Sequence, residues 1–257
     1  MQLFIVLVAL LGLMGCSKTL VTNRYQLMLV EGNQEIAKAK RLEKMILRRV
    51  KLSQDKEMTQ RLNRVGKKIS SVTDQYYNTQ GYHWAFYLIE NDEEINAFCL
   101  AGGKVFVYSG LLNYVQSDDE LAIVLGHEIA HALSHHVEEK KSLAKVSKIF
   151  KGVLDFMVDL NTQSIPLNTR LEHKLVDGWI KEHILFPHSR TQEYEADHIG
   201  LILASKAGYD LDVAVDFWHR LSEEISTQKA YASTHPTPED RMEKIQAFII
   251  TLEQRKI

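Results

Sequence analysis

The first stretch of regular hydrophobic spacing predicts two amphipathic helices. Over Asn33–Val50, and again over Asp55–Ser71, apolar residues recur with a period close to that of a helix, and charged residues fill the positions between them. This spacing places the apolar side chains along one helix face. Many of the charged residues are Lys and Arg, and we interpret them as a solvated surface rather than a binding patch.

After Gly81 the pattern becomes typical of strands. His83–Ile89 is aromatic and apolar, and Ile95–Leu100 is a second candidate strand. A Gly-Gly turn signal then leads into Lys104–Tyr108. In that segment a two-residue period puts the valines on one face and the aromatic residues on the other. Residues 82–109 are therefore predicted to form a small sheet.

Helical spacing returns after Ser117, which is a good N-cap followed by three acidic residues. Leu121–Val137 is predicted to continue as one long helix. Further helices are predicted at Lys141–Leu160, Trp179–Phe186, Gln192–Ala207, Val213–Glu224 and Pro238–Arg255. Together these patterns predict an α+β fold that is mostly helical, with helices at 33–71 and 118–255 on either side of the small sheet.

Composition narrows the classes of function. A chain of 257 residues can bury one sizeable core. The formal charge of −2 provides no basic field that would recruit nucleic acid, so no nucleic-acid partner is expected. The two cysteines, Cys16 and Cys99, do not make a disulfide framework.

The N-terminus has the features of a leader. The apolar run Leu3–Met14 is shorter than the roughly 20 residues that span a bilayer and matches the length of a signal-peptide core. The run ends at Gly15-Cys16, which resembles a bacterial lipobox, although no Lys or Arg precedes it. We therefore predict a signal peptide at 1–15, lipidation of Cys16, and a single domain at 16–257. A buried helix or an uncleaved anchor remains the alternative.

The candidate chemistry lies in the long helix, where His127, Glu128 and His131 form an His-Glu-x-x-His motif. Residues four apart share a helix face, so the two imidazoles can bind one Zn²⁺ at about 2.0–2.1 Å each. Glu128 can then act as the base toward a water at the open coordination position. The helical turns around the motif are apolar, so this helix is expected to be buried. Because a buried helix does not carry two His and a Glu without partners, the motif is interpreted as a site and not as a charged surface turn.

The third ligand decides the kind of zinc site. In metzincins the motif continues with a Gly and a third His, but this chain has Ser134 and Val137 there. His135 lies on the same face but about 12 Å along the axis from His127, at roughly 1.5 Å per residue, so one ion cannot bind both. We expect His135 and His136 to be solvated or to lie beside the ligands.

A second helix can supply a carboxylate instead. Glu193 and Asp197 are four apart and project from one face. Glu193 is predicted to be the third ligand. Asp197 is predicted to accept a hydrogen bond from a ligating His and so to fix its orientation. Glu195 points elsewhere by helical geometry, and the alternative for the whole segment is an acidic first turn capped by Ser189 or Thr191.

These motifs resemble the gluzincin metallopeptidase family that contains HtpX, the CAAX prenyl protease and the mitochondrial Oma protease. The resemblance runs from about Val21 to Arg241 and includes the blocks 95–110 and 234–241. It is greatest to the Oma-like, periplasm-facing lipoproteins. It implies a zincin fold, one Zn²⁺ per chain, protein or peptide substrates, and a bacterial envelope location with a lipid anchor in the outer membrane. An uncleaved inner-membrane or a mitochondrial setting is the alternative.

The resemblance also implies roles that spacing does not give. The sheet edge at Asn96, Ala97 and Phe98 would bind an extended substrate by strand addition. His235 would lie near the metal, either steadying the oxyanion or covering the zinc. Arg241 would hold a carboxylate rather than touch substrate.

The sequence thus predicts a zinc metalloendopeptidase that acts on misfolded or membrane-associated proteins in envelope quality control. The rival hypothesis is a chaperone-like or scaffolding lipoprotein with a zinc site that is not catalytic. An intact Glu128 argues against the rival, because a structural site needs no open position.

Overall fold

The computed structural model describes residues 16–19, 21–29, 32–146, 188–227, 235 and 241–254. The predicted leader at 1–15 and the predicted helix Trp179–Phe186 lie outside these residues. So does the predicted helix Lys141–Leu160 beyond its first residues, 141–146, which are helical. The fold that emerges is α+β and mostly helical, as the hydrophobic patterns predicted.

The chain begins with a small hairpin that the sequence patterns did not predict. Strand β1 (Cys16–Lys18) pairs antiparallel with β2 (Tyr25–Leu27). The two predicted amphipathic helices follow as α2 (Gly32–Leu47) and α3 (Lys56–Tyr76). The Asp55 side chain caps α3 by accepting a hydrogen bond from the backbone of Met58.

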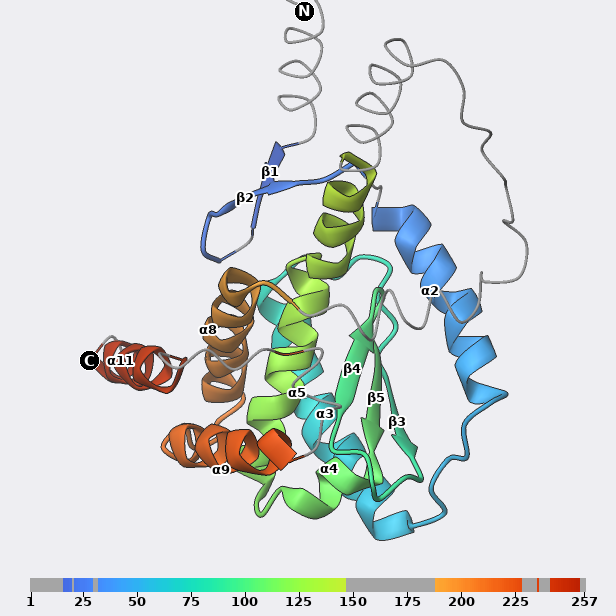
Figure 1. Ribbon diagram of the computed structural model, residues 1–257, viewed down its shortest axis with the longest axis vertical. Helices are drawn as coiled ribbons and strands as arrows, with labels where there is room; N and C mark the ends of the chain where they lie inside the picture. The colour runs from blue at the N-terminus through green and yellow to red at the C-terminus, as the bar shows by residue number, and fades with distance from the viewer. Residues whose placement is uncertain are drawn as a thin grey trace, which may run out of the picture.

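The sheet contains β3 (Ala85–Ile89), β4 (Ala97–Leu100) and β5 (Lys104–Tyr108) in the order β3-β5-β4. β5 is parallel to β3 and antiparallel to β4, so β4 lies at an edge. Figure 1 shows the sheet between α2 on one side and the helices α3 and α5 on the other. The predicted alternation in β5 is confirmed. Its valines pack in the core shared with α3 and α5, whereas Phe106 packs against α2.

The remaining helices surround one central helix, α5 (Asp118–Leu133), whose residues from Glu120 onward are buried on every side. The others are α4 (Ser109–Tyr114), α8 (Arg190–Lys206), α9 (Val213–Thr227) and α11 (Arg241–Gln254). Ser117 caps α5 as predicted, because its hydroxyl accepts a hydrogen bond from the backbone of Glu120.

α5 and α8 cross at two glycines. A Cβ atom added to Gly126 would lie 2.7 Å from the carbonyl oxygen of Gly200, and one added to Gly200 would lie 2.7 Å from the backbone nitrogen of His127. The absence of both side chains lets the two backbones approach closely. This contact brings α8 against the His-Glu-x-x-His segment (Figure 1).

One predicted element was wrong in extent. The helix predicted over Leu121–Val137 ends at Leu133, and the chain turns at Ser134 and His135 before helix resumes at His136. His135 has a φ of 54°, a left-handed conformation that terminates a helix. The turn reorients the next helical segment relative to α5, and His136 with it.

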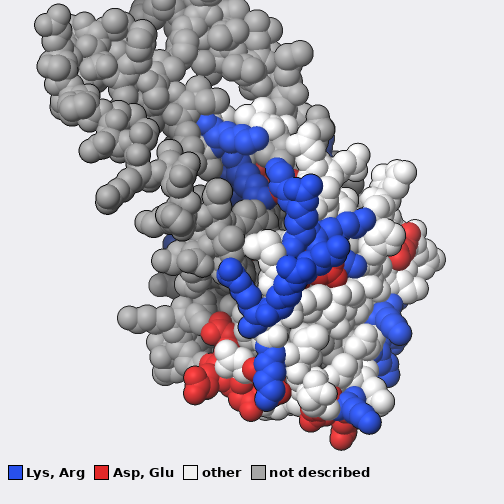
Figure 2. Space-filling view, turned by 90° about the vertical axis from the view of Figure 1, so that its right-hand side faces the viewer, with Lys and Arg blue, Asp and Glu red and all other residues white. Residues whose placement is uncertain are grey.

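The exposed surface of α2 is basic. Lys38, Lys40, Arg41 and Lys44 of this helix are all exposed, and so is Arg48 just after it. Figure 2 shows Lys and Arg gathered on the side of the molecule that α2 covers. None of the described helices is both long and apolar enough to cross a membrane.

Candidate metal centre

The centre begins with two imidazoles on α5. His127 and His131 are four residues apart on one face of the helix, and both are buried. Their Nε2 atoms lie 3.0 Å apart. Two ring nitrogens this close in a buried site need a cation or a proton between them, because two lone pairs facing each other repel.

Glu193 reaches the same point from α8, as predicted from its spacing. Its carboxylate oxygens lie 3.5 Å from His127 Nε2 and 3.4 Å from His131 Nε2. The Ser189 side chain and Gln192 form a capping box that starts α8 one turn before Glu193 and fixes where the carboxylate emerges.

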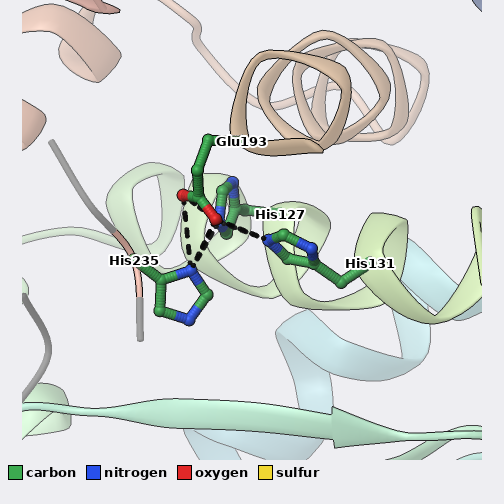
Figure 3. A group of neighbouring side chains, drawn as sticks. All are labelled: His127, His131, Glu193 and His235. Carbon is green, nitrogen blue, oxygen red and sulfur yellow. Dashed lines mark hydrogen bonds and ion pairs between the residues drawn. The ribbon is translucent and has the colours of Figure 1, made fainter. Parts of the chain in front are cut away.

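His235 completes the cluster from a different part of the chain. Its Nδ1 lies 3.3 Å from His127 Nε2 and 3.2 Å from Glu193 Oε1. Figure 3 shows the four side chains converging on one point, with Glu193 descending from α8 onto the imidazoles of α5. These four residues form a group that could hold a metal ion.

The spacing of the donor atoms suits zinc. Four ligands about 2.0–2.1 Å from a tetrahedral Zn²⁺ would lie roughly 3.3 Å from one another. The distances that join His127 to the other three residues, and Glu193 to His131 and His235, run from 3.0 to 3.5 Å. The donor set of imidazoles and one carboxylate is also the set that catalytic zinc sites use.

Glu128 lies beside this cluster without belonging to it. Its Oε1 is buried, accepts no hydrogen bond from the part of the chain that the structure describes, and lies 3.6 Å from His235 Nε2. Burial raises the pKa of this carboxyl group. A buried acceptor that lacks a protein partner is suited to receive a proton from water or substrate.

The side chains of the cluster have pKa values that are shifted in different directions. Burial would raise the pKa of Glu193, but the neighbouring His235, His127 and His131 lower it well below its ordinary value. Burial lowers the pKa of His131 well below its ordinary value, which keeps that ring neutral and able to bind a metal. Among the protein groups alone, Asp197 and Glu193 overcome the effect of burial and raise the pKa of His127 to about 9.

Asp197 contacts His127 on the side of the ring that faces away from the cluster. Its Oδ1 lies 2.9 Å from His127 Nδ1, so the ring presents its other nitrogen to the cluster. Arg241 donates two hydrogen bonds of 2.8 Å to the same carboxylate, one from Nε and one from Nη2. The neighbouring Arg241 charge and the contact with His127 hold the pKa of Asp197 below its ordinary range, although burial opposes this.

Sequence reasoning underestimated His136. It is fully buried, and its Nδ1 lies 2.8 Å from Nδ1 of His131. The prediction that it could be solvated is therefore wrong, whereas the prediction that it could lie beside a ligand is confirmed. His188, which the sequence did not single out, stacks on His131 with ring centroids 3.9 Å apart. Neither neighbour could be found from spacing, because both depend on how the chain turns outside α5.

The predicted substrate strand is the edge strand β4, which packs against α5. Asn96, just before it, accepts a hydrogen bond from the backbone of Tyr108. In an antiparallel pair, hydrogen-bonded and non-hydrogen-bonded residues alternate. Ala97 and Cys99 therefore direct their backbone groups away from β5, toward the open edge, and Phe98 directs its backbone inward. The nitrogen of Ala97 is covered by the Asn96 side chain at 2.8 Å.

The fold is α+β and is built around a buried helix with paired histidines, and a second helix supplies a carboxylate. These features define the chain as a zincin-like protein. Residues 56–249 match Peptidase family M48, and the chain belongs to that family.

Curated relatives agree with this assignment. The chain is 35% identical over 191 residues to the mitochondrial metalloendopeptidase OMA1 of Schizosaccharomyces pombe, covering 73% of this chain and 52% of the relative. It is 36% identical over 178 residues to OMA1 of Arabidopsis thaliana, covering 68% and 33%. It is 32% identical over 168 residues to the putative beta-barrel assembly-enhancing protease of Vibrio cholerae, covering 62% and 33%. The aligned region thus spans about half or less of each relative's length.

Proposed function

We propose that this chain is a zinc-dependent metalloendopeptidase with one Zn²⁺ held by His127, His131 and Glu193. The observation that carries the proposal is the convergence of these three side chains from two helices, with the Glu128 carboxylate beside them. The names of the relatives support the proposal, because OMA1 of Schizosaccharomyces pombe is called a metalloendopeptidase.

In the proposed mechanism, Glu128 moves the proton. A zinc ion held by His127, His131 and Glu193 would supply polarisation of the substrate carbonyl and would lower the pKa of water toward roughly 7. The Glu128 carboxylate accepts a proton from the attacking water and passes it to the nitrogen of the leaving amine. Its raised pKa, caused by burial, makes it a stronger base than an exposed glutamate.

His235 is assigned a second role at the centre. Its Nδ1 lies among the metal ligands and its Nε2 faces Glu128. In this conformation the ring covers the position that a substrate carbonyl needs. A ring that turned aside would instead donate a hydrogen bond to the oxyanion that develops during hydrolysis.

Substrate is proposed to bind as an added strand along β4. The backbone groups of Ala97 and Cys99 face the open edge, Asn96 lies just before the strand, and Phe98 lies between Ala97 and Cys99 with its backbone toward β5. Strand addition uses main-chain hydrogen bonds, so it tolerates many sequences. Such tolerance fits an enzyme that removes misfolded proteins.

We further propose that Cys16 is lipidated and that the enzyme faces the periplasm from the outer membrane, in envelope protein quality control. The lipobox-like segment and the similarity to the Vibrio protease support this location. The similarity to mitochondrial OMA1 supports the alternative of a mitochondrial inner-membrane enzyme. Labelling with palmitate tests the choice: incorporation that a Cys16→Ser variant loses supports the lipid anchor, and a Cys16→Ser variant that stays membrane-bound excludes it.

The deciding experiment measures zinc content and cleavage of unfolded casein together. Wild type is expected to hold zinc and to cleave in a chelator-sensitive manner. Glu128→Gln should keep its zinc and lose at least about a hundredfold in kcat, because it can no longer accept the proton. Glu120→Gln is the matched control, since it alters another buried glutamate of α5 that contacts Arg220 instead of the centre. It should cleave at the wild-type rate.

The same experiment separates the enzyme from the rival chaperone-like lipoprotein. If wild type and Glu128→Gln both protect an unfolded outer-membrane protein from aggregation, and neither cleaves it, the zinc site is structural and the rival is correct.

A further inference from the structure

The zinc ligand His131 is the first group of a buried hydrogen-bonded chain that leads away from the centre. Its Nδ1 lies 2.8 Å from Nδ1 of His136, and His136 Nε2 lies 3.2 Å from Glu195 Oε2. All three residues are buried. The left-handed turn at His135 orients His136 so that its ring can face back toward His131.

The ring protons follow from the geometry. His131 directs Nε2 toward the other metal ligands, so its proton is on Nδ1 and is donated to His136. His136 Nδ1 is then an acceptor, and its proton is on Nε2, where Glu195 accepts it. Each ring thus has one tautomer that satisfies every contact, and the carboxylate at the end sets both.

Glu195 is in turn held by the N-terminal hairpin, here the segment Cys16–Leu27. The Thr22 hydroxyl donates to Glu195 Oε1, and Arg24 Nε donates to Oε2 at 2.9 Å. Arg24 also forms a two-pronged contact with the buried carboxylate of Glu139, at 2.6 and 2.8 Å. One guanidinium therefore joins α8 to the helical segment that carries His136.

We propose that His136 and Glu195 are positioning residues for the zinc ligand His131, and that the N-terminal hairpin holds them in place through Thr22 and Arg24. The hairpin is then part of the metal centre rather than a linker to it. Because the hairpin begins at Cys16, the residue proposed to carry the lipid, the same contacts would set the orientation of the anchored enzyme. This inference rests on the proposed function, since it concerns a ligand of the proposed zinc ion.

The test measures zinc affinity of the full chain by competition with a chromophoric chelator. His136→Phe keeps an aromatic ring but removes both hydrogen bonds, and it should weaken zinc binding roughly 10–100-fold. His136→Asn places its amide oxygen where Nδ1 was and should stay within roughly fivefold of wild type, because His131 keeps its acceptor. If the ring had a purely structural role, His136→Phe would instead bind zinc more tightly than His136→Asn.

The hairpin is tested with mild changes, because removing the Arg24 charge would take the positive partner away from two buried carboxylates, Glu139 and Glu195. Thr22→Val and Arg24→Lys should each weaken zinc binding several-fold. Arg61→Lys is the matched control: its side chain is 24% exposed against 23% for Arg24, and it contacts Asp118 away from the centre. It should bind zinc as wild type does.

A double-variant cycle decides whether the hairpin acts through His136. Arg24→Lys should weaken binding in the wild-type background but add nothing in the His136→Phe background. Equal loss in both backgrounds would overturn the proposed path. Wild-type affinity in His136→Phe would overturn the role of His136 while leaving the proposed zinc enzyme intact, whereas a wild type that binds no zinc would overturn both.

Discussion

At the scale of residues, three buried carboxyl groups of the centre differ in pKa because they have different partners. Burial raises the pKa of Glu128, because this group lacks a strong partner among the described residues. Glu193 and Asp197 are equally buried, but positive neighbours lower their pKa values. One carboxyl group is thereby suited to take up a proton, and the other two are suited to stay charged as a ligand and as a support.

The support given by Asp197 can be measured directly. Asp197→Asn should weaken zinc binding roughly 10–100-fold, because His127 loses its charged acceptor and Arg241 loses a buried counter-ion. Chelator competition gives the affinity. The matched control is Asp118→Asn, which also removes a carboxylate that accepts two hydrogen bonds from arginine, here from Arg61 and Arg64, but lies outside the centre. Equal zinc affinity in the two variants would contradict the role of Asp197.

Glu195 gives a prediction for pH. Burial would raise its pKa, but hydrogen bonds from His136, Thr19 and Thr22 lower it from 4.5 to about 2. A lowered folded-state pKa stabilises the protein above the ordinary pKa, and this contribution is lost as pH falls through the folded-state value. In chelator-treated protein, wild type should therefore exceed Glu195→Gln in stability at pH 6, with the gap closing between about pH 4.5 and pH 2. A gap that widens in this window would refute the assignment.

Residue spacing identified two pairs of side chains in the centre, but not the crossing of α5 and α8 that brings the pairs together. His127, His131, Glu193 and Asp197 follow from helical geometry, because four-residue spacing fixes a common face. His136 did not follow, since its place depends on the left-handed turn at His135, and a non-glycine residue gives little warning of such a turn. The place of His235 came from family resemblance, not from spacing.

At the scale of elements, the close crossing of α5 and α8 sets the reach of Glu193. Gly200→Ala should lower the free energy of unfolding by about 1–3 kcal/mol, because its Cβ would collide with the backbone of His127. It should also weaken zinc binding, since the helices must separate. Gly32→Ala is the control, because its Cβ would meet its nearest neighbour at an ordinary 3.9 Å. Denaturant unfolding and chelator competition measure both effects, and wild-type behaviour of Gly200→Ala would contradict this role of the crossing.

Elements with a strong period or a cap were predicted well. The two-residue period of β5 and the caps at Ser117 and Ser189 mark their elements in the sequence. The N-terminal hairpin was missed because each strand has only three residues, too few to show a period. Tertiary contacts, such as those of Arg24 with Glu139 and Glu195, join it to the rest of the fold.

At the scale of the whole molecule, the centre exists only when distant segments fold together. His127 and His235 are separated by 108 positions in the sequence, and Glu195 and Thr22 by 173. Helix α5 alone provides the two imidazoles and Glu128, and the rest of the fold supplies Glu193, His235 and the supporting contacts. A ligand that binds only the folded chain stabilises it, so zinc should raise the melting temperature of the protein.

We propose that nitrogen and oxygen atoms of this fold hold one zinc ion. X-ray absorption spectroscopy of the zinc-loaded full chain, with metal content determined on the same sample, tests it most directly. We predict one zinc per chain with only nitrogen and oxygen ligands at about 2.0–2.1 Å. A shell of sulfur at about 2.3 Å, as ligation by Cys99 would give, or a chain that holds no zinc after loading, would contradict the account.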